Sequence, residues 1–578
     1  MRITLAETAG FCMGVRRAVE LVLDAPKQHP EPIYTYGPLI HNPQVLAFLE
    51  EKGIQPLKEI PARGAGTVLI RAHGVPPQSI QALRDAGFEV IDATCPRVIR
   101  VQSIIKRHAR TGHTTIIVGD RDHPEVVGLL GHAGPHGVVV PDFEALTALP
   151  AFEKAVIVAQ TTQNRELYDR VKRWIGRHHP SYLVFDTICD STEKRQAEAK
   201  RLSDMADAVV VVGGRNSGNT QRLAQIAQQS GKPTYHVETD SELRPEMLVG
   251  VEHLGITAGA STPTWVINRV YRRIDNLLVG EKISANRILY ILRRALLLTN
   301  IYVAAGAGCL TDACMRLLGL GFEKRLPFAT VAALYVLSMH MINNLIQSRS
   351  ERFNDPGRAY FYRQYRLPLT VLAIAAGAGG IVTAAALGPE PFVLLLGMSA
   401  LGLIYNLRLV PGQGLFNRYR RLRDLPGAKT ILISLAWGVA AAVLPALAVG
   451  SIAPHRVAVV FGWCTGLVFA RTAFFDILDI QGDRMLGKET IPLVFGEATT
   501  VRYLKRLLLL LPVLLVVAVS VGWIPGLGVM LSVCPLLLFV LIRVYEKKRI
   551  FPGTRLEFMV ESTFILAGML SFVWGVLT

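Results

Sequence analysis

Apolar stretches in the second half of the chain constrain what this sequence can fold into more than any other feature. Several approach the ~20 residues with which a helix crosses the hydrocarbon core of a bilayer, although the first and the fourth are short. They predict an all-α membrane domain of nine transmembrane helices within residues 281–578, and a hydrophobic content of 51% over the 578 residues argues against a wholly soluble protein. The stretches are Ala295–Leu310, Leu326–Ile346, Leu367–Leu387, Pro391–Tyr405, Thr430–Val449, Arg456–Ile477, Leu507–Val521, Gly526–Ile542 and Phe558–Leu577.

Positive charge is concentrated in this apolar half. Residues 1–280 hold 32 basic and 30 acidic residues, whereas residues 281–578 hold 30 and 15. The excess lies between the apolar stretches, mainly in segments 347–366, 406–429, 478–506 and 543–557. A nucleic-acid-binding protein would carry such charge on a soluble face, so we expect no nucleic-acid partner. The positive-inside rule instead predicts a multi-pass protein of the inner (cell) membrane, in contact with lipid, whose residues 1–280 are cytoplasmic.

The first half has the pattern of an α/β domain. Short β-branched runs such as Thr67–Arg71, Thr115–Asp120 and Ala208–Gly213 alternate with polar amphipathic stretches, which predicts repeated βα units and mainly parallel sheet. Many of the runs end in polar or glycine-rich turns, and ligands of parallel sheets bind at the carboxyl ends of the strands. The seven cysteines, an odd number, and the absence of a signal-peptide pattern at Met1–Gly10 favour a reducing compartment.

Three cysteines, Cys12, Cys95 and Cys189, lie at or near such turns, one in each third of the first half. Each precedes a helical pattern, and a helix amino terminus favours a thiolate. The three could hold three irons of a [4Fe–4S] cluster and leave the fourth iron open to bind substrate. Their wide spacing is no cluster signature, and buried apolar thiols are the alternative.

Polar side chains in the neighbouring turns favour an anion-binding site. Glycine-flanked serine and asparagine at strand-to-helix turns suit phosphate oxygens, and backbone N–H groups add donors. A single histidine in such a turn would more often be a structural group, but six polar residues in equivalent turns indicate a site. They are His41, His73, His123, Ser217, Asn219 and Ser261.

Glu125 is the carboxylate that we expect in this site, because it follows His123 by two residues. Reductive loss of a hydroxyl group needs a proton delivered to a poor leaving group, and a positioned carboxyl group can deliver it. Thr161 or Thr162 could supply the hydroxyl that positions Glu125. The alternative is an ordinary solvated acid at the start of a helix.

Most of the site residues of the first half lie in eight short motifs. In chain order they are Phe-Cys-Met-Gly-Val, Gly-Pro-Leu-Ile-His-Asn, Arg-Ala-His-Gly-Val, Asp-Ala-Thr-Cys-Pro, His-Pro-Glu-Val, Gln-Thr-Thr, Thr-Ile-Cys and Asn-Ser-Gly-Asn-Thr. Together these motifs resemble the 4-hydroxy-3-methylbut-2-enyl diphosphate reductase family, the LytB type, over about residues 1–275. The resemblance implies a three-module α/β fold around a [4Fe–4S] cluster held by Cys12, Cys95 and Cys189.

The same resemblance implies the roles of the polar residues. The allylic hydroxyl of the substrate would bind the open iron, and Glu125 with Thr161 or Thr162 would relay protons. Electrons from a donor such as ferredoxin or flavodoxin would then expel the hydroxyl as water, giving isopentenyl and dimethylallyl diphosphates in the methylerythritol phosphate pathway of isoprenoid biosynthesis. Gly218 stands where the family usually has a second serine, from which we expect weakened binding. The diphosphate would be held by His41, His73, Ser217, Asn219 and Ser261, with His123 close by.

In the second half, Asp476, Asp479 and Asp483 lie at the cytoplasmic end of the sixth apolar stretch. Positions i, i+3 and i+7 share one face of a helix. Clustered acids at a membrane boundary are costly, so this group favours a Mg²⁺ site for a diphosphate, with Lys429 pairing with the diphosphate charge. The alternative is the solvated start of a loop.

Residues 285–578 resemble the UbiA prenyltransferase superfamily, on the nine spans and on the motifs Leu-Pro-Gly-Ala-Lys-Thr and Asp-Ile-Leu-Asp-Ile-Gln-Gly-Asp. Members hold Mg²⁺-diphosphate with two acidic motifs. The first motif departs here, because it reads Asn343, Asn344, Gln347 and Glu351, and neutral amides cannot replace carboxylates as charged Mg²⁺ ligands. Prenyl transfer is therefore in doubt, and Glu351 or Asp355 is left to hold a single ion.

We therefore expect an iron-sulfur reductase in residues 1–280 and a UbiA-like membrane domain in residues 281–578 that binds or transfers prenyl diphosphates. Two alternatives stay open. The second half could be a non-catalytic membrane anchor, or the chain could be an iron-sulfur electron-transfer protein without substrate chemistry. The latter predicts no need for His41, His73, Ser217 and Asn219.

Overall fold

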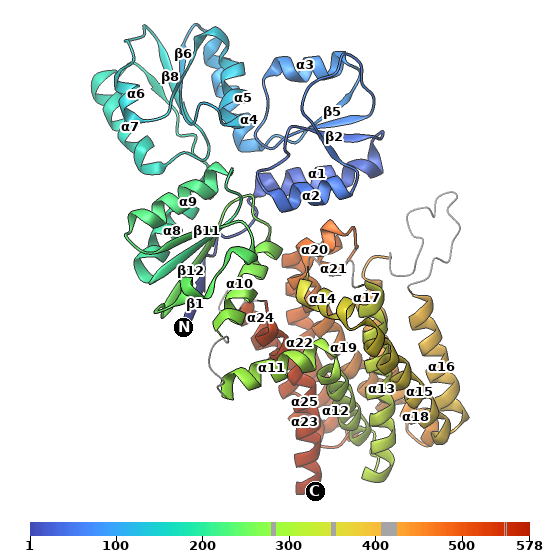
Figure 1. Cartoon of the computed structure of the whole chain (residues 1–578). Helices are drawn as coiled ribbons and strands as arrows, with labels where there is room; N and C mark the ends of the chain where they lie inside the picture. The colour runs from blue at the N-terminus through green and yellow to red at the C-terminus, as the bar shows by residue number, and fades with distance from the viewer. Residues whose placement is uncertain (279–284, 348–353, 406–424, 548–549, 551) are drawn as a thin grey trace. The chain divides into compact units, whose positions relative to one another are not determined.

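A computed structural model describes residues 1–278, 285–347, 354–405, 425–547, 550 and 552–578. The chain divides into two compact units, Met1–Gly280 and Glu281–Thr578 (Figure 1). Each unit is described by itself.

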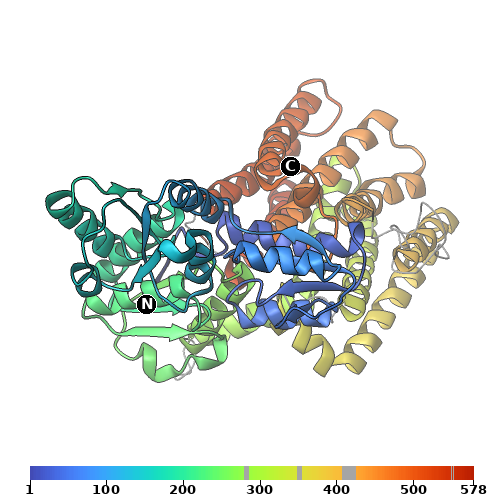
Figure 2. The ribbon, with the colours of Figure 1, turned by 90° about the horizontal axis from the view of Figure 1, so that it is seen from above.

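The first unit contains three four-stranded parallel sheets, which form three separate lobes (Figures 1 and 2). The runs predicted as strands near residues 67, 115 and 208 are confirmed. The sheets, each in spatial order, are β3 (Gln55–Leu57), β2 (Ile33–Tyr36), β4 (Thr67–Ile70) and β5 (Glu89–Asp92); β7 (Gly137–Val140), β6 (Thr114–Val118), β8 (Ala155–Ala159) and β9 (Leu183–Val184); and β11 (Thr234–Val237), β10 (Ala208–Val212), β12 (His253–Ala258) and β1 (Arg2–Leu5).

Strands at the centres of these sheets are buried along their whole length, as in β4, β8 and β10. Parallel sheets have helices on both faces, so their central strands are continuous apolar runs rather than alternating ones. This explains why the strand signal in the sequence is strongest there. The helices of the unit are α1 (Met13–Gln28), α2 (Pro43–Glu51), α3 (Pro77–Asp85), α4 (Pro96–Ala109), α5 (Pro124–Ala133), α6 (Phe143–Thr147), α7 (Arg165–His178), α8 (Asp190–Met205), α9 (Gly218–Gln229) and α10 (Thr264–Leu278).

The described part of the second unit is helical. Its helices are α11 (Ala285–Leu298), α12 (Ile301–Leu317), α13 (Phe322–Gln347), α14 (Pro356–Gln364), α15 (Arg366–Leu387), α16 (Pro389–Ile404), α17 (Ala428–Gly438), α18 (Leu444–Val449), α19 (Pro454–Leu478), α20 (Ile480–Met485), α21 (Ile491–Phe495), α22 (Glu497–Ser520), α23 (Leu527–Leu531), α24 (Val533–Glu546) and α25 (Thr554–Leu577). A π-helical turn, Val439–Val443, joins α17 to α18.

Seven helical segments among the described residues are long and apolar enough to cross a membrane. The segment on α19, Pro454–Leu478, is the most enclosed: 61% of its most apolar window is buried, against 28% on α15 and α22. Its Trp463 and Phe474 lie in the main apolar cluster of the unit. The nine spans expected from the sequence are therefore matched in part, and that total stays a prediction.

The first expected span, Ala295–Leu310, is wrong as a single straight helix. The chain bends by 73° between α11 and α12, and Asn300 at the break has a φ of 56°. Asparagine tolerates this left-handed conformation better than most residues. Its side chain is buried and donates a hydrogen bond to the Tyr362 hydroxyl at 2.7 Å. Hydropathy continues through the bend, so the sequence pattern gave no sign of it.

Candidate functional site

The three sheets of the first unit present their strand ends in the same spatial order. In each sheet, one of the two edge strands is followed by none of the predicted site residues. These edge strands are β3, β7 and β11. Polar site residues follow the two central strands of each sheet, and a cysteine follows the opposite edge strand. The amino-terminal strand β1 completes this pattern by pairing with β12 at the end of the unit. Each sheet thus contributes two polar turns and one cysteine.

Each of the three cysteines is the N-cap residue of a helix, Cys12 of α1, Cys95 of α4 and Cys189 of α8. The Sγ of Cys12 accepts a hydrogen bond from the backbone N–H of Val15 at 3.5 Å. All three are free thiols and are partly exposed. Burial raises the pKa of Cys95, while N–H donors of α4 act in the opposite direction. Helix amino termini that face thiols in this way stabilise negative charge on sulfur, as a metal or cluster ligand requires.

One cavity of the first unit brings together every residue that the sequence predicted for this half. Ser191 and Thr192, which also line it, were missed, although they lie two and three residues after Cys189 in the sequence. The roles of the predicted residues stay predictions, but their convergence is a property of the fold. They are Cys12, His41, His73, Cys95, His123, Glu125, Thr161, Thr162, Cys189, Ser217, Gly218, Asn219 and Ser261.

Glu125 is held by Thr161. One carboxylate oxygen accepts the backbone N–H of Thr161 at 2.6 Å, and the other accepts its hydroxyl at 2.8 Å. Thr162 is bonded elsewhere, because its hydroxyl accepts a hydrogen bond from Gln160. Glu125 is only 1% exposed, so it is not a solvated helix-start acid. Burial raises the pKa of Glu125 to about 7, against the lowering effect of the two Thr161 bonds, which makes it a proton donor near neutral pH.

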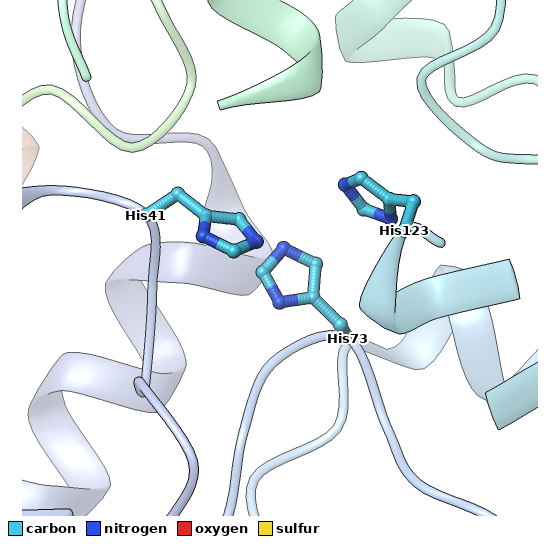
Figure 3. A group of neighbouring side chains, drawn as sticks. All are labelled: His41, His73 and His123. Carbon is cyan, nitrogen blue, oxygen red and sulfur yellow. The ribbon is translucent and has the colours of Figure 1, made fainter. Parts of the chain in front are cut away.

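Three histidine rings from two lobes, His41, His73 and His123, lie around one small space (Figure 3). Ring centroids are 4.7 Å apart for His41 and His73 and 5.3 Å apart for His73 and His123. Burial lowers the pKa of all three, that of His123 to about 4. The rings are therefore neutral at physiological pH in the absence of a ligand.

By composition this trio could hold a transition-metal ion, but the hydrogen bond of His123 favours an anion instead. The Nδ1 atom of His123 accepts the backbone N–H of Glu125 at 3.1 Å. A neutral imidazole that accepts at Nδ1 carries its proton on Nε2. That N–H group can donate to an anionic oxygen, whereas a metal ion would need the unprotonated lone pair. The trio is thus better suited to donating hydrogen bonds to phosphate than to metal coordination.

Other polar atoms in the cavity have no protein partner within the described part of the chain. They include both polar atoms of the Asn219 amide, which is 5% exposed. The Nε2 of His41 and the Nδ1 of His73 are also unpartnered. Buried polar groups are nearly always hydrogen-bonded, so a cluster of exceptions indicates a ligand that supplies the missing bonds. Ser261 and Ser217 lie beside them, with 3.3 Å between their hydroxyl oxygens.

A partly buried cation near the histidines was not predicted from the sequence. Arg71, two residues before His73, acts electrostatically on all three rings and contributes to their lowered pKa values. Burial also lowers the pKa of Arg71. A guanidinium group keeps its charge in proteins, so Arg71 gives this end of the cavity a positive potential suited to an anion. The sequence signal that could have identified Arg71 is its place in the Arg-Ala-His turn, two residues before His73.

In the second unit, two predicted carboxylates are already paired with lysines. Asp476 is fully buried, accepts a hydrogen bond from Thr430, and pairs with Lys429 at 3.2 Å. Asp483, 1% exposed, pairs with Lys488 at 3.1 Å. These buried carboxylates contradict a solvated loop start. The expected single helix face is also wrong, because α19 ends at Leu478 and Asp479 precedes α20.

The segment expected to carry the first acidic motif is described only in part. Asn343 and Asn344 lie on α13, the side chain of Gln347 is not described, and Glu351 lies outside the described residues. Asp355 is the N-cap of α14 and pairs with Arg358 at 3.6 Å. Asn354 donates to Asp483 at 3.0 Å. A Cβ atom on Gly482 would lie 1.6 Å from the Asn354 amide oxygen, so Asn354 needs glycine there.

The first unit is thus an α/β enzyme domain whose cavity brings candidate anion ligands together with three free thiols, and the apolar helices of the second make this a multi-pass membrane protein. The chain belongs to the LytB protein family, which matches residues 3–275. Residues 321–566 match the UbiA prenyltransferase family. Both families expected from the sequence are confirmed.

Relatives cover each half. The 4-hydroxy-3-methylbut-2-enyl diphosphate reductase of Aquifex aeolicus is 42% identical over 286 residues, which are 49% of this chain and 99% of the relative. A solved structure of (E)-4-hydroxy-3-methyl-but-2-enyl diphosphate reductase is 43% identical and covers 48% of this chain and 99% of its own, with a TM-score of 0.37. A UbiA homolog from Archaeoglobus fulgidus, solved with GPP and Mg²⁺, is 14% identical over 49% of this chain and 98% of its own, with a TM-score of 0.35.

Proposed function

We propose that residues 1–280 form a 4-hydroxy-3-methylbut-2-enyl diphosphate reductase domain, which removes the substrate hydroxyl as water and releases isopentenyl and dimethylallyl diphosphates. The observation that carries this proposal is the shared cavity, in which three free cysteines, a protonatable carboxyl group and unpartnered anion ligands lie together. The 42% identity to the Aquifex aeolicus reductase supports it. The three cysteines come from three different lobes and line one cavity, a convergence that purely structural thiols would not require.

Cys12, Cys95 and Cys189 fit an iron-sulfur cluster, because three thiols at helix amino termini line one cavity. A [4Fe–4S] cluster bound there would supply the electrons for the reaction, received from ferredoxin or flavodoxin. The three cysteines leave one iron of such a cluster without a protein ligand. The three cysteines and the polar residues line the same cavity.

The protein groups bind the diphosphate and move the proton. His41, His73 and Asn219 have unpartnered polar atoms that can bond to phosphate oxygens, and Ser217 and Ser261 add hydroxyl groups. Glu125, protonated and held by Thr161, gives its proton to the leaving hydroxyl. Overall, substrate, two electrons and two protons give the product diphosphate and water.

The alternative of a pure electron-transfer protein requires none of these polar groups. It leaves the unpartnered amide of Asn219 and the unpartnered ring atoms of His41 and His73 without a purpose, although each costs free energy when buried. The test is turnover of 4-hydroxy-3-methylbut-2-enyl diphosphate by the purified, cluster-loaded full chain with a chemical reductant, with both product isomers quantified. A loaded but inactive chain would leave the electron-transfer alternative.

For residues 281–578 we propose a UbiA-like domain that crosses the inner membrane nine times and binds prenyl diphosphates. The seven long helices, the bent pair α11–α12 and the shorter apolar helix α16 supply nine apolar segments. Basic residues gather in alternate connections, which supports a cytoplasmic location for residues 1–280 by the positive-inside rule. Asp476, Asp479 and Asp483 would hold Mg²⁺, which would neutralise diphosphate charge, and Lys429 would add a further positive charge.

The test is Mg²⁺-dependent binding of geranyl diphosphate to the full chain in detergent. The Asn219→Ala background weakens binding at the reductase site, and Asp479→Asn is the control for the second site. Binding that needs both Mg²⁺ and Asp479 supports a functional prenyl diphosphate site with one acidic motif. No binding in the Asn219→Ala chain would make the second half a membrane anchor.

A further inference from the structure

Arg195 joins two of the three cysteine-bearing segments. It lies on α8, the helix that begins after Cys189, and reaches the segment that leads to Cys12. Its guanidinium donates to the Gly10 carbonyl at 2.7 Å and to the Ala258 carbonyl at 3.2 Å. Gly10 precedes Cys12 by two residues, and the N–H of Cys12 is bonded to Ala260, two residues beyond Ala258. Arg195 therefore links the Cys12 segment to α8.

Glu198, on the next turn of α8, holds the same segment from the other side. Its carboxylate accepts the backbone N–H groups of Glu7 and Thr8 at 2.6 and 2.8 Å and the Thr8 hydroxyl at 2.6 Å. The loop after β1 is thus docked on α8 by one cationic and one anionic side chain. Neither residue lines the cavity itself.

The charge of Arg195 is enclosed by protein. The side chain is 3% exposed, and its hydrogen-bond acceptors, two carbonyls and the Ser191 hydroxyl, are uncharged. Burial lowers the pKa of Arg195, and negative charge on Cys12, Glu198 and Cys189 opposes that shift. An arginine remains protonated under all these influences. A full positive charge therefore interacts with two of the three cysteines, Cys12 and Cys189, in surroundings that screen it weakly.

We propose that Arg195 is a positioning residue that holds the Cys12 segment on α8, and that its buried charge raises the reduction potential of the cluster bound by the three cysteines. This inference rests on the proposed function. Reduction adds negative charge to a cluster, and nearby positive charge stabilises the reduced form. Glu198 acts in the opposite sense. The pair would thus set how strong a reductant the domain requires.

Two other arginines also bond to cysteine-bearing segments. One of them, Arg97, is more exposed than Arg195 and serves as the control. Arg17 donates to the carbonyl of Thr94, next to Cys95, at 3.2 Å. Arg97 pairs with Asp190, next to Cys189, at 2.5 Å, and its side chain is 40% exposed. Arg97 lines the cavity itself, but its charge is paired with Asp190 and screened by solvent, so we expect it to influence the cluster less than the enclosed charge of Arg195 does.

The experiment is a redox titration of the cluster-loaded full chain, followed by the EPR signal of the reduced state. The variants are Arg195→Gln, Arg195→Lys, Glu198→Gln and Arg97→Gln. We expect a more negative potential for Arg195→Gln, a potential close to that of the wild type for Arg195→Lys, a more positive one for Glu198→Gln, and the smallest shift for Arg97→Gln. Both Arg195 variants should lose iron to a chelator faster than the wild type, because lysine cannot bond both carbonyls.

An unchanged potential in Arg195→Gln, or equal shifts in Arg195→Gln and Arg195→Lys, would overturn the electrostatic role. If Arg195→Gln loads no cluster, Glu198→Gln decides, and a potential equal to or below that of the wild type overturns the role. Wild-type chelator resistance in Arg195→Lys would overturn the positioning role. A wild-type chain without a cluster or without turnover contradicts the proposed function instead, so the two failures are distinguishable.

Discussion

The candidate sites of the two units differ in how their buried polar groups find partners. In the first, the Asn219 amide and two histidine ring atoms have no protein partner among the described residues, although they lie in a cavity. In the second, the buried carboxylates of Asp476 and Asp483 are each paired with a lysine. The unpartnered groups of the first unit suit an anion from outside. In the second unit, cations of the protein itself pair with both acids, and Asp483 keeps one oxygen without a partner among the described residues. The comparison shows that acidic residues which look like metal ligands in the sequence can be paired with lysines of the same chain in the structure.

The difference bears on metal binding. A diphosphate–Mg²⁺ complex entering the second unit must compete with Lys429 for Asp476 and with Lys488 for Asp483. The first unit imposes no such competition, because the histidine and amide atoms named above have no protein partner among the described residues that a phosphate would have to displace. We therefore expect substitutions to reduce ligand binding in the first unit and to change stability in the second.

Cys95→Ser should have the largest effect, because a hydroxyl cannot replace a thiolate as a ligand to iron. We expect loss of the cluster absorbance and of all measurable turnover. Iron content and product formation by the purified full chain are the measurements. Cys309→Ser, in the second unit, is the matched control, and Cys309 is also a free, partly exposed cysteine. Equal loss in both variants would contradict a site confined to the first unit.

Glu125→Gln should keep the cluster and reduce turnover by ~10²–10⁴-fold, the usual contribution of a general acid. The amide can still bond to Thr161 but has no proton to give. The measurements are the absorbance spectrum and the rate of product formation. Normal turnover would exclude the proton-relay role.

The pH dependence of turnover tests the role of Glu125 in a second way, because its raised pKa fixes the direction in which the rate should change. The pKa of Glu125 is raised to about 7 by burial, so the protonated, donating form dominates below pH 7 and is lost above it. Turnover should therefore fall as the pH rises through about 7 in the wild type. In Glu125→Gln this alkaline decline should be absent from the residual rate. A decline that persists in the variant belongs to another group.

Asn219→Ala should raise KM by roughly 10- to 100-fold, because truncating a buried hydrogen-bonding partner costs ~1–3 kcal/mol in binding. The cluster should remain intact. Gln228→Ala, an exposed residue of the same helix α9, is the control and should leave KM unchanged. An unchanged KM in Asn219→Ala would mean that its unpartnered amide does not face the substrate, and the contrast between the two units would weaken.

Lys429→Met should lower the stability of the second unit by about 1–2 kcal/mol, because it leaves the Asp476 charge buried without its cation. The value is at the low end for buried pairs because the Lys429 side chain is 36% exposed. Combining it with Asp476→Asn should recover part of the loss. Thermal unfolding of the full chain in detergent measures the cycle. A neutral single substitution would show that Asp476 does not rely on Lys429.

Gly218→Ser should have the smallest effect, a decrease in KM of about 2- to 5-fold, as one added hydrogen bond provides. A Cβ atom at position 218 would lie 3.4 Å from the His123 ring, so the serine fits without displacing its neighbours. KM from initial rates is the measurement. A raised KM would mean that the glycine serves the geometry of this turn.

Local sequence patterns were sufficient to predict many of the strands, helices and site residues of this protein. β-Branched runs predicted β4, β6 and β10 because strands buried on both faces need continuous apolar residues. Hydropathy likewise indicated the long membrane helices, since lipid requires a minimum apolar length. The residues of the reductase cavity were also identified, because polar turns after strands meet at the carboxyl ends of parallel sheets.

Only the tertiary structure decided which of these residues touch. It bonded Glu125 to Thr161 rather than Thr162, paired Asp476 with Lys429 across 47 positions of the chain, and joined Arg195 to Gly10 across 185. It also placed one cysteine at the same edge of each sheet, with β1 completing the third. Burial and charge pairing arise from contacts between distant segments, and a pattern read along the chain contains the residues but not those contacts.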